Sequence, residues 1–378
     1  MIKKIIILGA TGSIGKETLD VVRQYKDKFE IAAISAHTNQ DKLLRISNEF
    51  NIKILGLSGM NSDNPRIRYS GNNSIRNLIE NTNADIVVNG IAGSEGLMPS
   101  VISLKSGKDL ALANKETIVM AGKLIMELAK SLQKKIIPVD SEHSAIFHLL
   151  ENRDLNTLKE IIITASGGPF RQTPLKDFSN IKLKDALKHP TWEMGKKITI
   201  DSATMANKGL EVIEAHGLFS LSEDKIKVLI HPESRVHSLI RTIDNSMFAQ
   251  ISNPDMRVPI GNALFYPNLM ESSFGELNLA EKTLTFFEAD YERYPLLKYA
   301  YDTIKHGKAY PIAYNASNEI SVDYFLNNRI KFTDISEIVS NILDKDWSME
   351  PGSIEDIIET DQKVRKLTKS FIDKTIRK

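Results

Sequence analysis

The sequence predicts an α/β protein whose amino-terminal part is a doubly wound, Rossmann-like parallel sheet. Short apolar, β-branched runs alternate there with helix-length amphipathic segments, and a glycine-rich turn over 9–15 directly follows the first run. Continuous apolar strands separated by helices are typical of parallel sheets that are covered on both faces. The alternation is lost further along the chain, which predicts an α+β domain followed by a small helical domain.

The predicted strands of the first sheet are 5–8, 31–35, 54–57, 86–88, 110–113 and 136–139. A further run, 161–165, leads into SGGPF and a polar stretch to about Lys197 that has few helix or strand signals. Long loops of this kind are usually lids or binding loops. Beyond the loop we predict a helix over 203–218 and a second, antiparallel sheet formed by 228–230, 238–241 and 247–251. From about Leu297 the pattern is helical, and Ser353 and Asp356 form a capping box before the last helix.

The composition excludes several functional classes. The 378 residues contain 49 Lys and Arg against 48 Asp and Glu, a net charge of +1, which argues against partners such as nucleic acid or anionic membranes. Cysteine is absent, so any metal must bind to oxygen or imidazole ligands. The first apolar run is shorter than the roughly 7–15 residues of a signal peptide, and no later stretch approaches the roughly 20 of a membrane span. We therefore expect a cytoplasmic protein that begins with its first strand.

The turn Gly9-Ala10-Thr11-Gly12-Ser13-Ile14-Gly15 lies between a strand and a helix. Glycines in this position let the backbone approach a pyrophosphate, whose charge is stabilised by amides at the helix amino terminus. The spacing is GxxGxxG rather than GxGxxG, and a plain tight connection is the alternative. The strand–turn–helix context favours dinucleotide binding.

The end of the second strand indicates which dinucleotide binds. NAD enzymes usually place an acid there, on the ribose hydroxyls, but this chain has Ser35-Ala36-His37-Thr38-Asn39. An uncharged, hydrogen-bonding end can accept a 2′-phosphate, so NADP is favoured over NAD, although the usual Arg or Lys is missing too. His37, Thr38 and Asn39 are the candidates, and a plain polar loop is the alternative.

Two segments carry candidate metal and phosphate ligands. In an extended chain, Asp140 and Glu142 would point the same way, and two close carboxylates favour a cation such as Mg²⁺ or Mn²⁺ between them. The alternative is that Glu142 caps a helix starting near Ser141. Further along, Asn207, Lys208 and Glu211 share one helix face at i,i+3 and i,i+4 spacing, either as a site or as a surface ion pair. Ser202 and the helix amino terminus beside them suit a phosphate.

Two further segments are candidates for cofactor and substrate contacts. Asn114, Lys115 and Glu116 end a strand at the carboxyl edge of the parallel sheet, where α/β proteins bind ligands, although Asn114 could equally cap the next helix. The long loop contains His189 and Trp192 in polar surroundings. An indole on such a segment indicates a lid that closes on a ligand, rather than a small hydrophobic core of its own.

Together these segments resemble the 1-deoxy-D-xylulose 5-phosphate reductoisomerase family over nearly the whole chain. The resemblance rests on GATGSIG, LALANKET, PVDSEHSAIF, TASGGPFR, HPTWEMGKKITIDSATMANKGLEVIEAH, IHPESRVHSLI and NPDMRVPIGNAL, in family order. It implies an NADPH-binding domain over 1–140, a catalytic domain over 141–275 with a flexible flap over about 166–197, a linker over 276–296 and a helical domain over 297–378. A homodimer is also implied.

The resemblance assigns the site residue by residue. The implied ligands of Mg²⁺, Mn²⁺ or Co²⁺ are Asp140, Glu142 and Glu211. The implied phosphate-binding set is Ser166, Ser202, Asn207 and Lys208. Contacts to the oxygen-bearing carbons of the substrate are Lys115, Ser141, Glu142 and His189, with Trp192 and Met194 on the flap. The implied NADPH contacts are Thr11, Gly12, Ser13, Ile14, Asn39, Asn114, Glu116 and Gly195.

The implied reaction is the NADPH- and metal-dependent conversion of 1-deoxy-D-xylulose 5-phosphate to 2-C-methyl-D-erythritol 4-phosphate in the non-mevalonate isoprenoid pathway, inhibited by phosphonate hydroxamates such as fosmidomycin. Many relatives have Gly-Lys-Asn where this chain has His37-Thr38-Asn39, which leaves the strength of the NADPH preference open. One alternative is another NADP- and metal-dependent dehydrogenase that acts on a semialdehyde or hydroxy acid. The other is a catalytically silent nucleotide sensor, which should lack the metal-binding acids.

Overall fold

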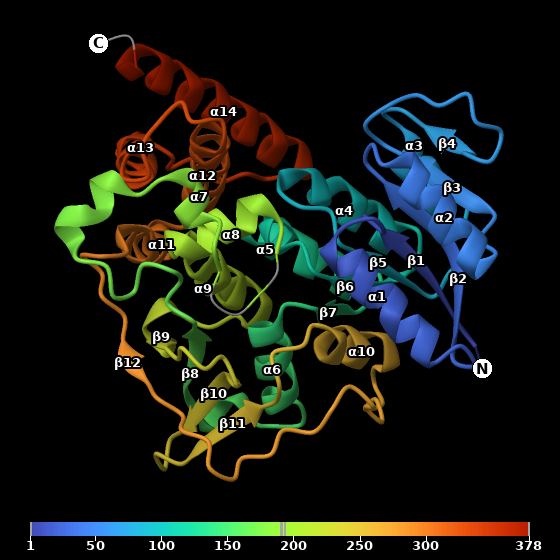
Figure 1. The fold of residues 1–378 in the computed structure, drawn as a ribbon, viewed down its shortest axis with the longest axis horizontal. Coiled ribbons are helices and arrows are strands. Elements are labelled where there is room, and N and C mark those ends of the chain that lie inside the picture. The colour runs from blue at the N-terminus through green and yellow to red at the C-terminus, as the bar shows by residue number, and fades with distance from the viewer. Residues whose placement is uncertain (1, 190–191, 193, 377–378) are drawn as a thin grey trace. The chain divides into compact units, whose positions relative to one another are not determined.

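The chain divides into two compact units. The computed structural model describes residues 2–189, 192 and 194–376. The first unit comprises Met1–Thr117, Ile125–Phe147 and Asp255–Glu276, and the second comprises Ile118–Leu124, His148–Pro254 and Leu277–Lys378 (Figure 1). Every helix among the described residues is either too short or too polar to cross a lipid bilayer.

The first unit contains a seven-stranded parallel sheet with the order β4-β3-β2-β1-β5-β6-β7. Its strands are β1 (Lys3–Leu8), β2 (Phe29–Ala36), β3 (Ile54–Leu57), β4 (Tyr69–Ser70), β5 (Ile86–Asn89), β6 (Asp109–Leu112) and β7 (Ile136–Pro138). The six predicted strands are confirmed. The sequence did not predict β4, because two residues are too few for a periodic pattern. The strand order reverses beside β1, which is where open α/β sheets bind their ligands.

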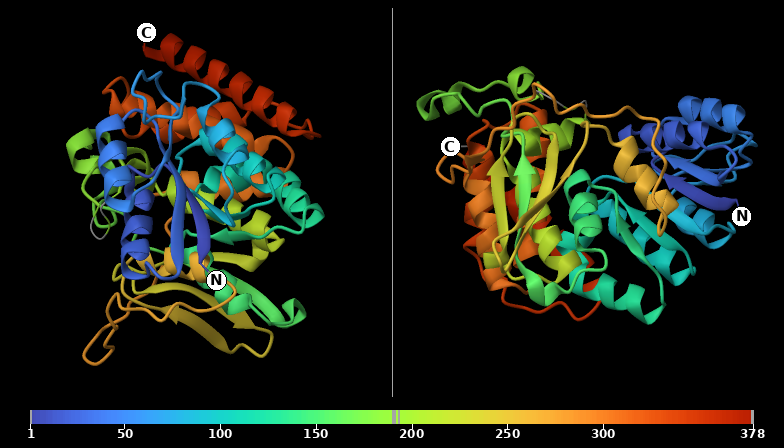
Figure 2. Two further views of the ribbon diagram at one scale, coloured as in Figure 1. Left: turned by 90° about the vertical axis from the view of Figure 1, so that its right-hand side faces the viewer. Right: turned by 90° about the horizontal axis from the view of Figure 1, so that it is seen from below.

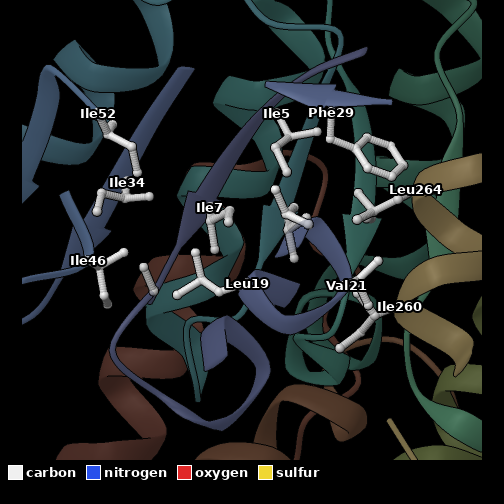
Figure 3. Close-up of a cluster of buried hydrophobic side chains, with 14 of the residues drawn as sticks. Ile5, Ile7, Leu19, Val21, Phe29, Ile34, Ile46, Ile52, Ile260 and Leu264 are labelled. Atoms are coloured by element: carbon white, nitrogen blue, oxygen red, sulfur yellow. The ribbon is translucent and has the colours of Figure 1, made fainter. Parts of the chain in front are cut away.

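The helices that begin in the first unit are α1 (Ser13–Gln24), α2 (Gln40–Phe50), α3 (Ser74–Glu80), α4 (Leu97–Lys105), α5 (Lys115–Ser131), α6 (Ser141–Leu150) and α10 (Arg257–Phe265). The last of these, α10, comes from a segment far from the sheet in sequence. Its Ile260 and Leu264 pack into the same buried cluster as Ile5 of β1 and Phe29 of β2 (Figure 3). The Nζ of Lys3 also donates to the carbonyl of Leu264 at 2.7 Å. The core of the first unit therefore needs residues from both ends of its sequence.

The second unit contains a five-stranded sheet with the order β11-β10-β8-β9-β12, seen from two further sides in Figure 2. Its strands are β8 (Leu158–Ala165), β9 (Ile226–Ile230), β10 (Val236–Thr242), β11 (Met247–Ile251) and β12 (Phe287–Glu288). The sheet is not antiparallel throughout, as predicted, because β8, which the prediction did not assign to this sheet, pairs with β9 in parallel. A parallel pair needs a long crossover connection, and the described chain between these strands forms three α-helices instead of a hairpin.

The main helices of the second unit are α7 (Leu183–Ala186), α8 (Lys196–Ala203), α9 (Ala206–Phe219), α11 (Pro295–His306), α12 (Tyr310–Leu326), α13 (Asp334–Leu343) and α14 (Ile354–Ile376). The prediction of one helix over 203–218 is wrong at its start. Ala203 ends α8, and Met205 has a φ of +60° that interrupts the helical path before α9. The hydroxyl of Thr204 accepts from the amide of Ala206, and such local side-chain bonds compete with helix continuation.

The helical carboxyl-terminal part agrees with the sequence pattern. The hydroxyl of Ser353 accepts from the amide of Asp356 at 3.1 Å, which confirms the predicted cap of α14. Ile357 and Val364 are buried as their spacing requires. Leu367 of the same helix is 36% exposed.

We expect the substitution Ile260→Ala to lower the free energy of unfolding of the first unit by about 2–5 kcal/mol, because it would leave a cavity in a fully buried cluster. Chemical denaturation followed by circular dichroism measures this. The matched control is Leu269→Ala, at a side chain that is 74% exposed, which should change stability by less than about 0.5 kcal/mol. Equal losses in the two variants would show that α10 does not complete this core.

Candidate active site

The glycine-rich turn leads from β1 into α1 and depends on glycine at two positions. Gly9 has a φ of +75°, and a Cβ there would lie 2.9 Å from the carbonyl oxygen of Gly90. A Cβ on Gly15 would lie 2.4 Å from the Cα of Ala10. Gly12 is the N-cap of α1 and has no side chain to bond the first amides of the helix. A bound anion can take these amides, so the turn fits a pyrophosphate.

The predicted residues at the end of β2 are exposed and partly engaged by the protein itself. Asn39 caps α2, with its side-chain oxygen accepting from the amide of Lys42 at 3.1 Å. The Nδ1 of His37 lies 3.1 Å from the hydroxyl of Ser58. Sequence reasoning missed the side chain of Lys42, whose Nζ donates to the carbonyl of Thr11 at 2.8 Å. No strand-end pattern could identify it, because it lies within α2.

Asn114 joins the ends of two neighbouring strands. Its side-chain oxygen accepts from the amide of Thr117 at 2.9 Å, so the alternative that Asn114 caps the next helix is confirmed. Its Nδ2 also donates at 2.8 Å to the carbonyls of Ile91 and Gly93, which follow β5, and at 3.0 Å to the carboxylate of Glu116. The amide therefore fixes the orientation of Glu116 at the carboxyl edge of the sheet.

Asp140 is the centre of a buried charged group after β7. The Nζ of Lys115 donates to its Oδ2 at 2.9 Å, and both side chains are about nine-tenths buried, with 7% and 11% exposed. The Nδ1 of His143 lies 3.1 Å from its Oδ1. Sequence reasoning gave His143 no role, although its i,i+3 spacing from Asp140 on a helix was a usable signal.

The prediction that Asp140 and Glu142 project from an extended chain is wrong. Helix α6 begins at Ser141, and the Oδ1 of Asp140 accepts from the amides of Glu142 at 3.1 Å and His143 at 3.3 Å. Asp140 therefore caps the helix, and Glu142, which the alternative named as the cap, lies in the first turn and accepts from the hydroxyl of Ser141. The start of one helix still supplies two neighbouring carboxylates.

In the second unit, α9 presents the predicted amide, ammonium and carboxylate together. The Nδ2 of Asn207 donates to one carboxylate oxygen of Glu211 at 2.5 Å, and the Nζ of Lys208 donates to the other. Lys208 and Glu211 are only 3% and 1% exposed, so the alternative of a surface ion pair is wrong. Lys208 also lies in the first turn of α9, where the helix amino terminus adds positive potential for an anion.

The turn after β8 lies against the end of α8. A Cβ on Gly168 would be 2.7 Å from the carbonyl oxygen of Ser202, so Ser166 and Ser202 lie on adjoining segments. Ser202 is in the last turn of α8 rather than at the amino terminus of the helix that carries Asn207, which corrects the predicted arrangement. The hydroxyl of Ser166 lies 3.3 Å from the Nε2 of His189.

His189 is held as a neutral imidazole. Its Nδ1 accepts from the amide of Trp192 at 2.9 Å, so the proton of the neutral ring is on Nε2, facing Ser166. Burial lowers the pKa of His189 to about 4. Trp192 and Met194 are half-buried, and Gly195 is the N-cap of α8. Three members of the predicted flap, Pro190, Thr191 and Glu193, lie outside the described residues.

The predicted site residues belong to both units. The first unit contains the predicted cofactor contacts except Gly195, together with Lys115, Asp140, Ser141 and Glu142. The second unit contains Ser166, His189, Trp192, Met194, Gly195, Ser202, Asn207, Lys208 and Glu211. A doubly wound sheet with a nucleotide-type turn and buried, lysine-paired carboxylates defines a nucleotide-dependent enzyme of the α/β class.

Comparison with known proteins narrows this class of enzyme to one family. The family model of 1-deoxy-D-xylulose 5-phosphate reductoisomerase matches residues 5–122, and models of its C-terminal domain match residues 136–219 and 251–367. The 1-deoxy-D-xylulose 5-phosphate reductoisomerase of Treponema denticola is 46% identical over 366 residues, which are 96% of this chain and 95% of the relative. That of Chlorobaculum tepidum is 44% identical and covers 98% and 100% of the two chains.

Solved structures agree with this result. A crystal structure of DOX-P reductoisomerase in complex with NADPH, fosmidomycin and magnesium is 37% identical, with a TM-score of 0.91 over 98% of each chain. The enzyme of Zymomonas mobilis in complex with NADPH is 36% identical, with a TM-score of 0.89 over 98% of this chain and 99% of its own. The chain belongs to the 1-deoxy-D-xylulose 5-phosphate reductoisomerase family of oxidoreductases, as the resemblance predicted.

We expect the imidazole of His189 to titrate with a midpoint near pH 4, because burial disfavours its charged form. Since this pKa lies below the ordinary 6.5, the unfolded chain binds the proton first as the pH falls. Folding stability is therefore lost between about pH 6.5 and pH 4. Nuclear magnetic resonance of the ring nitrogens measures the midpoint, with His189→Gln to assign the signal. A midpoint near 6.5 would contradict the buried, neutral state.

Proposed function

We propose that this chain converts 1-deoxy-D-xylulose 5-phosphate into 2-C-methyl-D-erythritol 4-phosphate with NADPH and a divalent metal ion, as a step of non-mevalonate isoprenoid synthesis. One observation supports this most strongly. The carboxyl edge of a single parallel sheet carries both a glycine-dependent nucleotide turn, after β1, and the buried pair of Lys115, after β6, and Asp140, after β7. The groups proposed to bind the hydride donor and the groups of the charged reaction site therefore lie at the same edge of the sheet.

Asp140, Glu142 and Glu211 are the proposed ligands of Mg²⁺ or Mn²⁺, with Co²⁺ as a further option. Their carboxylate oxygens suit hard divalent cations, and the chain offers no thiolate that would favour a softer metal. When bound, the ion would polarise the carbonyl and hydroxyl oxygens of the substrate. Lys115 and Lys208, bonded to Asp140 and Glu211, balance the negative charge that neighbouring carboxylates would otherwise accumulate.

NADPH would deliver a hydride to the aldehyde that the rearrangement produces. The proposed contacts are Thr11, Gly12, Ser13, Ile14, His37, Thr38, Asn39, Asn114, Glu116 and Gly195. The glycine turn offers its helix amides to the pyrophosphate, and the amide of Asn114 holds Glu116 in one orientation. Pre-oriented groups lose little entropy when a cofactor binds.

The substrate phosphate is proposed to bind to Ser166, Ser202, Asn207 and Lys208, with Lys208 supplying the charge. Binding energy gained there, away from the reacting carbons, serves to position the rest of the molecule. The rearrangement breaks the C3–C4 bond, so both fragments have to be held while the bond is absent. Lys208 would hold the phosphate-bearing fragment, and Lys115, Ser141, Glu142 and His189 would hold the oxygen-bearing carbons. Neutral His189 donates from Nε2 without adding charge.

The segment 166–197 is proposed to act as a flap that brings Trp192 and Met194 over the substrate. Gly167 and Gly168, with φ of +83° and +66°, lie at one end, and Gly195 has open space around it at the other. Residues of this kind absorb the backbone rotation of a closing loop. Closure would exclude water while the carbon fragments are separated.

The proposal extends to the organisation of the protein. We retain the division into an NADPH-binding domain (1–140), a catalytic domain (141–275), a linker (276–296) and a helical domain (297–378). We also infer a cytoplasmic homodimer that binds neither nucleic acid nor membranes, in keeping with the net charge of +1. The edge strand β11 exposes Met247, Phe248 and Ile251 by 37–43%, and an apolar edge of this kind is usually covered by another chain.

The direct test of the activity is the loss of NADPH absorbance with purified protein and 1-deoxy-D-xylulose 5-phosphate, with and without Mn²⁺, and with NADH in parallel. Metal-dependent oxidation that prefers NADPH is expected. Oxidation or reduction of a semialdehyde or hydroxy acid, with no reaction of the sugar phosphate, would favour the dehydrogenase alternative instead.

We expect Asp140→Asn and Glu211→Gln each to reduce turnover at least about 100-fold, because each removes a metal-binding charge. The dissociation constant of NADPH, measured by fluorescence titration, should stay within about two-fold, since neither carboxylate serves the nucleotide. Asp244→Asn, at an exposed carboxylate in the turn after β10, is the control. Near-normal turnover of either site variant at saturating Mn²⁺ would remove that residue from the ligand set.

We expect Lys208→Ala to raise the KM for the sugar phosphate by about 10- to 100-fold, the range for losing a charge-assisted hydrogen bond. Steady-state kinetics measures the KM. Circular dichroism checks that the variant is still folded, since the substitution leaves the buried Glu211 without its lysine. The control is Lys227→Ala, at an exposed lysine of β9. An unchanged KM in a folded variant would mean that the phosphate binds elsewhere.

A further inference from the structure

A lysine from α2 reaches across to the glycine-rich turn. The Nζ of Lys42 donates to the carbonyl oxygen of Thr11 at 2.8 Å, and Thr11 lies between Gly9 and Gly12. The hydrogen bond therefore holds a positive charge beside the turn that, in the proposed function, binds the pyrophosphate of NADPH. Lys42 is outside the set of cofactor contacts that the sequence suggested.

Hydrogen bonds hold both the backbone and the side-chain ammonium group of Lys42 in place. Its amide donates to the side chain of Asn39, and α2 is held to the loop after β3 by the hydroxyl of Ser62, which donates to Gln40 at 2.5 Å. Its ammonium group is held by Thr11. An ammonium group has three donors, and the Thr11 carbonyl takes one. The group is thus pre-positioned, with further donors for an anionic ligand.

The other groups at the end of β2 supply little positive charge. Thr38 is uncharged, and the side-chain oxygen of Asn39 is engaged as the cap of α2. The ring of His37 is held by the hydroxyl of Ser58 and lies so close to Gly59 that a Cβ there would be 2.5 Å from it. In dinucleotide-binding sheets the adenosine ribose lies between the first glycine turn and the end of the second strand. A cation in this position would strengthen the binding of a 2′-phosphate on that ribose beyond what uncharged donors provide.

We propose that Lys42 binds the 2′-phosphate of NADPH and so determines the preference of this chain for NADPH over NADH. The inference rests on the proposed function, since it concerns the cofactor of the same site. Asp41, the neighbouring residue in the first turn of α2, is exposed and carries the opposite charge. Adjacent residues on a helix do not face each other, so Asp41 does not neutralise Lys42 at the turn.

The competing role for Lys42 is a structural tether that holds α2 to the turn. The two roles differ in what they do to NADH, which has the same pyrophosphate but no 2′-phosphate. Loss of a tether would deform the turn and weaken the binding of both nucleotides equally. Loss of a group that binds the 2′-phosphate would weaken the binding of NADPH alone.

The test is equilibrium binding of NADPH and of NADH to the full chain, by fluorescence titration without substrate. Lys42→Met keeps the length of the side chain and removes its charge, and Lys42→Arg restores a charge. We expect Lys42→Met to weaken NADPH binding about 30-fold while NADH changes by less than about two-fold. Lys42→Arg should retain most of the NADPH preference. Lys26→Met, at an exposed lysine after α1, is the matched control and should alter neither.

Two results would overturn the assignment while leaving the proposed function intact. Equal weakening of NADPH and NADH in Lys42→Met would show a tether. Unchanged binding of both would show that the 2′-phosphate binds elsewhere. If the unaltered protein bound neither nucleotide, the proposed function would fail and this inference with it.

Discussion

The pairing of buried lysines with buried carboxylates is the interaction on which the candidate site depends. Asp140 is bonded to Lys115 in the first unit, and Glu211 to Lys208 in the second. An isolated buried charge costs several kcal/mol, so neither unit could bury its carboxylate without the partner. Asp140 also accepts from an amide at the start of α6, and Lys208 lies in the first turn of α9. The charges that the chemistry needs are therefore built into the fold.

The parallel sheet explains why the first unit presents its groups together. Helices α1, α5 and α6 all begin at the carboxyl edge, after β1, β6 and β7, and their caps are Gly12, Asn114 and Asp140. These caps perform different tasks with the same geometry. Gly12 leaves its helix amides to a ligand, Asn114 joins two strand ends, and Asp140 holds a carboxylate in place. The lysine from α2 adds a positive charge to the first of them.

The sequence predicted the parts of the fold that depend on short-range patterns. Apolar runs identified the first sheet, the glycine spacing identified the turn, and i,i+4 spacing identified the face of α9 that carries Asn207 and Glu211. The misses have two causes. The helix break at Met205 and the capping role of Asp140 involve local side-chain bonds that hydrophobic periodicity does not reveal. The hydrogen bond from Lys42 to Thr11 is a tertiary contact that no local pattern encodes. The role of each site residue came from the family resemblance, because spacing alone left surface and site alternatives open.

The measurement that tests the account most directly is the location of a bound Mn²⁺ ion, by anomalous X-ray scattering from crystals of the protein grown with the metal. The account predicts a single strong peak coordinated by oxygens of Asp140, Glu142 and Glu211. A peak coordinated by other residues, with these three carboxylates bonded only to protein groups, would contradict the claim that the lysine-paired carboxylates are a metal site.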